Sequence, residues 1–80
     1  MNRESILKTI SETLADVLDE NEVKLTEATS ADEVDGWDSI AHVKLIIALE
    51  SVFDIRFEAD EITTPESIGD MITLIKSKMA

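Results

Sequence analysis

The chain has 80 residues, which suffices for one small domain with a modest hydrophobic core. Its 18 acidic and 7 basic residues give a net charge of −11 at pH 7, which disfavours binding to nucleic acid or anionic membranes and favours basic partner surfaces. Cysteine is absent, which excludes disulfides, thiolate metal sites and a cysteine nucleophile.

The N-terminus lacks the layout of a signal peptide, and no apolar run approaches the roughly 20 residues of a membrane span. Hydrophobic residues make up 44% of the chain, an ordinary share for a globular protein. We therefore expect a soluble, cytoplasmic monomer that binds neither nucleic acid nor membranes.

The first predicted element is an amphipathic helix from about Asn2 to Leu18, with Asn2 as its N-cap. Its apolar residues recur at spacings of three and four and form one stripe, which consists of Ile6, Leu7, Ile10, Leu14, Val17 and Leu18. Packing against a core accounts for this pattern, and nothing in the helix indicates chemistry.

A long polar loop follows, from Asp19 to Trp37. Loops of this length inside a compact domain need a reason. We expect some of its apolar residues to reach the core and tie the loop down; the candidates are Val23, Leu25, Ala28 and Val34. The segment from Thr26 to Thr29 is predicted to form a single turn.

The second predicted helix runs from Asp38, its N-cap, to Phe53. On a helical wheel one wide face is predicted to pack on the core; it comprises Leu45, Leu49, Val52 and Phe53, edged by Ala41, Ala48 and Ile46. A narrow arc on the opposite side holds Ile40, Val43 and Ile47, bordered by Lys44, Glu50 and Ser51. These polar neighbours favour an exposed apolar strip, the usual mark of a protein contact site. The alternative is that the three residues pack on the long loop.

The rest of the chain is predicted to be helical. A short third helix covers Phe57 to Ile62, with those two residues as inward anchors. The last helix begins with Thr64 as N-cap, Pro65 at the first helical position and Glu66 near the positive end of the helix dipole. Its apolar face comprises Ile68, Met71, Ile72 and Ile75, with Leu74 and Met79 nearby.

Gly69 inside the last helix costs about 1 kcal/mol of helix propensity relative to alanine, which a close helix–helix contact would explain. No stretch reads as a strand. The sequence therefore predicts an all-α fold: an antiparallel four-helix bundle in which residues 1–80 form a single domain. Three helices are long, the third is short, and a long loop joins the first two.

Ser39 stands out because an Asp-Gly turn and the cap residue Asp38 place its hydroxyl at an exposed helix N-terminus. Alone, Asp-Ser is a common capping arrangement. His42 is the only histidine, and no Gly-x-Ser-x-Gly motif accompanies the serine, so we expect no catalytic residue and no enzyme. We interpret His42 as a partly buried structural or pocket-lining residue, and Trp37 as a loop anchor that also shields the serine.

A calcium loop around Gly36 is excluded by spacing. With Gly36 as the sixth position, Ala31 and His42 would occupy the first and twelfth positions, which require carboxylates. We expect no metal site in this chain.

The stretch Gly36-Trp37-Asp38-Ser39-Ile40 resembles the signature of acyl carrier proteins and the related peptidyl carrier domains, in which Asp-Ser-Leu begins the second helix. The residues that extend the resemblance along this helix are Val43, Leu45, Ala48, Leu49, Glu50 and Phe53. The long first loop, the short third helix and the acidic character match as well, so the resemblance covers the whole chain.

The resemblance implies that a phosphopantetheinyl transferase moves 4′-phosphopantetheine from coenzyme A to Ser39. Asp38 would help to position the magnesium ion and the coenzyme A of that transferase. The arm's thiol would then carry acyl groups as thioesters, as in fatty acid or polyketide biosynthesis. Acyl-transferring or acyl-activating enzymes with basic patches would dock on the second helix. The expected contact residues are Trp37, Ile40, Val43, Lys44, Ile47 and Glu50.

The chain departs from the family pattern in three ways; the first is conservative, and the other two point to a specialised member outside ordinary fatty acid synthesis. Ile40 replaces the usual leucine, and Trp37 replaces a smaller residue, as in carriers of secondary or polysaccharide pathways. Lys44 and Ser51 stand where fatty-acid carriers usually have acidic residues. Two alternatives remain open: an aminoacyl or peptidyl carrier of the nonribosomal type, and an unmodified acidic helical module that binds a partner through the apolar strip.

Overall fold

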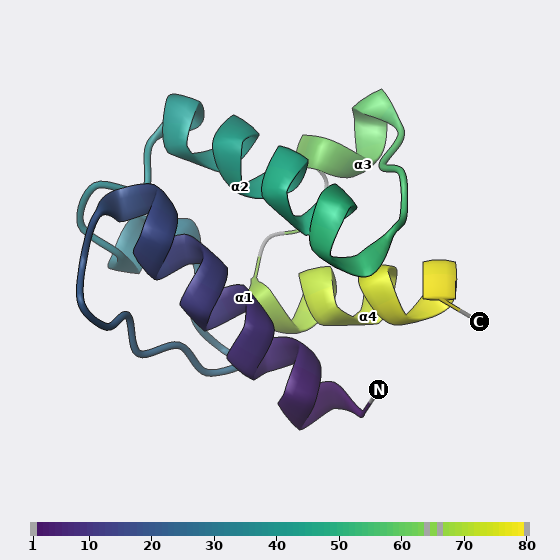
Figure 1. The fold of residues 1–80 in the computed structure, drawn as a ribbon, viewed down its shortest axis with the longest axis horizontal. Coiled ribbons are helices and arrows are strands. Elements are labelled where there is room, and N and C mark those ends of the chain that lie inside the picture. Colours follow the sequence, from purple (N-terminus) through teal and green to yellow (C-terminus); the bar gives the residue numbers. More distant parts are fainter. Residues whose placement is uncertain (1, 64, 66, 80) are drawn as a thin grey trace.

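The computed structural model describes residues 2–63, 65 and 67–79 (Figure 1). Its elements in chain order are α1 (Arg3–Leu18), the 3₁₀ helix η1 (Ala31–Glu33), α2 (Ser39–Phe53), α3 (Ala59–Thr63) and α4 (Ile68–Met79). All regular structure in this part of the chain is helical, which confirms the predicted all-α bundle with three long helices and a short third one. None of the helices described is long and apolar enough to cross a membrane.

The cap of α1 is the predicted one, since Asn2 Oδ1 accepts a hydrogen bond from the Ser5 N–H at 2.8 Å. The turn at Thr26 is present too, because the Thr29 N–H donates to the Thr26 carbonyl at 3.1 Å. The helix η1 was not predicted, although its sequence carries the signal. Glu33 Oε2 accepts from the Ser30 N–H at 2.8 Å, the half of a capping box that the Ser-x-x-Glu spacing indicates.

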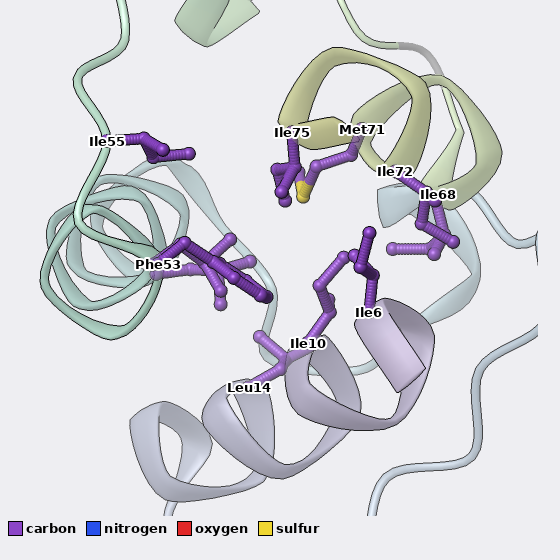
Figure 2. Packing of buried hydrophobic residues seen from close by; sticks show 11 residues of the cluster. Ile6, Ile10, Leu14, Phe53, Ile55, Ile68, Met71, Ile72 and Ile75 are labelled. Carbon is purple, nitrogen blue, oxygen red and sulfur yellow. The ribbon is translucent and has the colours of Figure 1, made fainter. Parts of the chain in front are cut away.

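Helices α1, α2 and α4 enclose one hydrophobic core. Figure 2 shows Ile10 of α1, Phe53 of α2 and Ile75 of α4 pointing toward a common centre. The core cluster comprises Ile6, Ile10, Leu14, Leu45, Leu49, Phe53, Ile55, Ile68, Met71, Ile72 and Ile75. Full burial of such a side chain contributes roughly 1.5–3 kcal/mol, so these apolar faces are the main source of stability.

One core prediction was wrong. Val52 was expected on the core face of α2 but is 56% exposed. Val52 lies in the last turn of α2, at the edge of the core face. A helical wheel shows the direction of a side chain but not whether a neighbouring helix extends far enough to cover it. In the long loop, Val23, Leu25 and Val34 do pack against the core, whereas Ala28 is exposed.

The start of α4 also differs from the prediction. Pro65 lies before the helix, which begins at Ile68. The long loop supplies the reason: the Glu27 and Thr29 carbonyls accept hydrogen bonds from the Gly69 and Ile68 N–H groups, both at 2.8 Å. These bonds satisfy donors that have no partner within a helix. The predicted roles of Thr64 and Glu66 lie outside the described residues.

We expected Gly69 to contact another helix, but it contacts the long loop. A Cβ atom at this position would lie 3.0 Å from the carbonyl oxygen of Glu27 and 3.3 Å from its Cβ. The missing side chain therefore lets the loop approach closely enough for its carbonyls to cap α4.

Arg3 holds the same junction from the other side. Its guanidinium contacts the Glu27 carboxylate at 2.6 Å, Thr73 Oγ1 at 2.9 Å and the Gly69 carbonyl at 3.1 Å. The hydrogen bonds from Arg3, helped by its charge, lower the pKa of the Glu27 carboxyl below its ordinary value. One side chain thus joins α1, the long loop and α4, which accounts for a loop of this length in a small domain.

Replacing Gly69 with alanine tests the close approach. We expect a net loss of stability, because crowding against the Glu27 backbone costs about 1–3 kcal/mol and outweighs the gain of about 1 kcal/mol in helix propensity. Urea unfolding measures the change. Lys76→Ala, at an exposed position of the same helix, should stay within about 0.5 kcal/mol of the unmodified protein. A Gly69→Ala protein as stable as the parent would contradict the close contact.

Candidate functional site

The site is built on the first turn of α2. Gly36 adopts a φ of +86°, in the left-handed region that glycine tolerates best, and turns the chain toward the helix. Asp38 Oδ1 then accepts from the Ala41 N–H at 2.8 Å, which confirms Asp38 as the N-cap. Ser39 is consequently the first residue of α2.

The Ser39 side chain is exposed, and its hydroxyl makes no hydrogen bond within the part of the chain that the structure describes. Other hydroxyls in the helices behave differently: Ser11 Oγ donates to the Leu7 carbonyl at 3.0 Å, four residues earlier. The residue four before Ser39 lies outside the helix, so the hydroxyl has no such acceptor. It is therefore exposed at the positive end of the helix dipole, where a negatively charged group is favoured.

The apolar strip of α2 is exposed, as predicted. Ile40 is 67% exposed, Val43 51% and Ile47 62%, so the alternative in which these side chains pack on the long loop is wrong. Lys44 beside them is exposed as well. Three apolar side chains on one arc of the helix next to Ser39 form a surface that a protein partner can bury.

Glu50, expected at the border of the strip, has a structural contact that the sequence did not reveal. Its Oε2 accepts from the Phe57 N–H at 2.8 Å. This bond fixes the chain just before α3. The signal was absent because the two residues lie in different elements and no local pattern links them.

Trp37 and His42 form a second unpredicted constellation beside Ser39. The Trp37 ring stacks on the His42 ring, with centroids 6.0 Å apart and planes at 27°. The Trp37 Nε1–H donates to His42 Nδ1 at 3.3 Å, and His42 Nε2 lies 2.7 Å from the Ile62 carbonyl oxygen of α3. Since indole can only donate, Nδ1 is the acceptor and the imidazole proton sits on Nε2.

These contacts confirm Trp37 as a half-buried loop anchor and His42 as a partly buried structural residue. His42 also lines a pocket, as the sequence suggested: an open cleft of about 470 Å³ beside Ser39. The cleft walls include Trp37, Val43 and Ile62. Both ring nitrogens of His42 are engaged away from Ser39, so the imidazole is not arranged as a base for the serine. Within residues 2–63, 65 and 67–79 no three His, Asp or Glu side chains group closely enough to hold a metal ion.

Comparison with known proteins places the chain in a family. No family model matches it. It is 35% identical to an acyl carrier protein of Clostridium acetobutylicum, across 90% of this chain and 94% of the relative. It is 39% identical to an acyl carrier protein of Rubrobacter xylanophilus, across 90% of this chain and 93% of the relative.

A solved structure agrees: the solution NMR structure of a holo acyl carrier protein from Geobacter metallireducens superposes with a TM-score of 0.82 at 33% identity. The match covers 91% of this chain and 84% of that one. The chain belongs to the acyl carrier protein family.

Membership in this family makes the chain an acyl carrier with a covalent 4′-phosphopantetheine arm, and not an enzyme. The residues present fit such a group, because an exposed serine hydroxyl, with no hydrogen-bond partner among the described residues, begins α2 beside an open cleft. The arm would supply the thiol for thioesters that a chain without cysteine lacks.

The cap of α2 can be tested by two substitutions at one position. Asp38→Ala removes the acceptor of the Ala41 N–H and should destabilise the protein by about 1 kcal/mol. Asp38→Asn keeps a side-chain oxygen and should recover most of that loss. Denaturant unfolding of both variants gives the comparison; equal stability of the two would mean that the cap does not define the start of α2.

Proposed function

We propose that Ser39 is the attachment point of the phosphopantetheine arm, and that a phosphopantetheinyl transferase loads it from coenzyme A. The main support for this proposal is the exposed hydroxyl at the first position of α2, which makes no hydrogen bond to any residue that the structure describes. In the transfer, Ser39 Oγ bonds to the phosphorus that bears pantetheine, the phosphoanhydride bond to the nucleotide portion breaks, and the hydroxyl proton passes to a base of the transferase.

Asp38 supports this reaction in two ways. Its Oδ1 caps the helix, which holds Ser39 in place. Its carboxylate also lies next to the reacting residue, where it can orient the transferase's magnesium ion. The first turn of α2 itself contains no acidic residue, so a newly attached phosphate meets the helix dipole without a carboxylate in that turn to oppose it.

The apolar strip of Ile40, Val43 and Ile47 is the proposed docking surface for the transferase and for acyl-transferring or acyl-activating enzymes. All three side chains are more than half exposed, and their burial by a partner would be favourable. The expected contacts extend to Lys44, Glu50 and Trp37 around the strip. The net charge of −11 favours partners with basic patches, because opposite fields accelerate encounter.

We also infer that residues 1–80 act as one carrier domain and work in the cytoplasm. The single core shared by α1, α2 and α4 supports the first statement. The absence of cysteine from the chain agrees with the second.

The attachment point is tested by intact mass. Incubation with coenzyme A, magnesium and a broad-specificity phosphopantetheinyl transferase should add one phosphopantetheine to the unmodified chain and none to Ser39→Ala. Ser51→Ala, at another exposed serine of α2, should be modified like the parent. An adduct that survives Ser39→Ala would overturn the assignment.

The docking surface is tested with two valines of similar exposure on one helix. Val43 is 51% exposed within the strip, and Val52 is 56% exposed outside it. Val43→Asp should lower kcat/KM of the transferase by roughly tenfold or more, because a carboxylate replaces an apolar contact at the interface. Val52→Asp should leave the rate nearly unchanged. Equal rates for the two variants would exclude the strip as the docking surface.

A further inference from the structure

We propose that His42 determines which acyl groups this carrier accepts. Its hydrogen bond to the Ile62 carbonyl closes the seam between α2 and α3 beside Ser39, so that the carrier serves short acyl groups and does not enclose a long alkyl chain. The inference rests on the proposed attachment of the cargo at Ser39, and it concerns the chemistry of that cargo.

The gap between His42 and Ile62 is too narrow for an alkyl chain. His42 Nε2 and the Ile62 carbonyl oxygen are 2.7 Å apart. An alkyl chain lying between two groups needs contact distances of roughly 3.5–4 Å on each side, which requires a gap of about 7–8 Å. A chain can enter here only if the hydrogen bond breaks and leaves a backbone carbonyl without its partner.

Trp37 holds the imidazole in the closing position. Its ring stacks on His42, and its Nε1–H occupies Nδ1. Both ring nitrogens are therefore engaged, and a rotation of the imidazole away from Ile62 would lose two hydrogen bonds and the stacking contact together. The long loop, α2 and α3 meet at this one side chain.

Helix α3 depends on such polar contacts for its position. None of residues 59–62 belongs to the core cluster, whose members come from α1, α2, α4 and Ile55. At its far side, Glu61 pairs with Lys78 of α4 at 2.7 Å. Removing the bond at His42 would take away one of these two polar contacts, which gives His42 its influence on the seam.

The space left for cargo is the open cleft beside Ser39. Its volume is about 470 Å³, and it is lined by Trp37, His42, Val43 and Ile62 among others. The core behind the seam offers no comparable room, since Leu45, Leu49 and Ile72 are completely buried against their neighbours. A short acyl group fits an open cleft of this size, whereas a long alkyl chain would remain partly in water.

Because the chain has no cysteine, a single introduced cysteine can be labelled specifically to test this proposal. Ser39→Cys creates a unique thiol, to which methyl, octyl or dodecyl groups can be attached with alkyl methanethiosulfonates. With His42 intact, Tm should stay within about 1 °C across the three chain lengths, because no chain is taken up. In the Ser39→Cys/His42→Ala protein, the dodecyl chain should raise Tm by about 3 °C or more over the methyl group, because the opened seam admits it.

Matched variants separate this role from a loss of general stability. His42→Gln keeps an N–H donor that can reach Ile62, and should restore the independence of Tm from chain length. His42→Leu, which has no donor, should behave like His42→Ala and replaces it if that protein does not fold. Each comparison is made between chain lengths within one variant, so a uniform change in stability cancels.

Two results would overturn the inference: a rise in Tm with chain length while His42 is intact, or no dependence on chain length in both His42→Ala and His42→Leu. Because the thiol is loaded chemically, neither result depends on a transferase. A failure to modify Ser39 with coenzyme A would instead count against the attachment point alone.

Discussion

The hydrogen bond from the Ala41 N–H to the Asp38 carboxylate fixes the residue at which α2 begins, and the site depends on that start. It makes Ser39 the first residue of the helix, so that no helical carbonyl four residues earlier is available to accept from its hydroxyl. The same start sets the directions of the residues that follow. Ile40 and Val43 then face solvent, while His42 faces α3.

The rest of the chain keeps this helix in place. Helix α2 packs its other face on α1 and α4, and the long loop bonds to the first turn of α4 through the Glu27 carbonyl. Arg3 and Gly69 complete that junction, one by its guanidinium and the other by the absence of a side chain. Since a small domain buries little surface, these polar ties matter for holding a long loop against the core.

Much of the fold follows from local pattern in the sequence. The apolar stripes of α1 and α4, the caps at Asn2 and Asp38 and the exposed strip of α2 all arise from helical periodicity and capping, which involve residues close in the chain. What the sequence did not reveal depends on distant residues. Gly69 meets the loop at Glu27, Glu50 bonds to Phe57, and Ile68 begins α4 because Thr29 accepts its N–H.

The candidate site also combines residues that local sequence pattern identified with contacts that it could not reveal. Asp38 and Ser39 were identified by their place at a helix start, and the family resemblance suggested the role that we propose for the serine. The link from Trp37 through His42 to Ile62 could not be predicted, because it requires the packing of α3 beside α2. Trp37 was nevertheless recognised as unusual for a fatty-acid carrier, and its contact with His42 now gives that departure a physical consequence.

The central proposal is that the arm is attached at Ser39, at the start of α2, so that loading it would change the surroundings of this residue and leave the core unchanged. Amide chemical shifts of the unmodified and phosphopantetheinylated protein, compared by two-dimensional ¹H–¹⁵N NMR, test it most directly. We expect changes confined to the start of α2 and to its neighbours Trp37, His42 and Ile62, with α1 and α4 unaffected. Shift changes throughout α1 and α4, or none around Ser39, would contradict it.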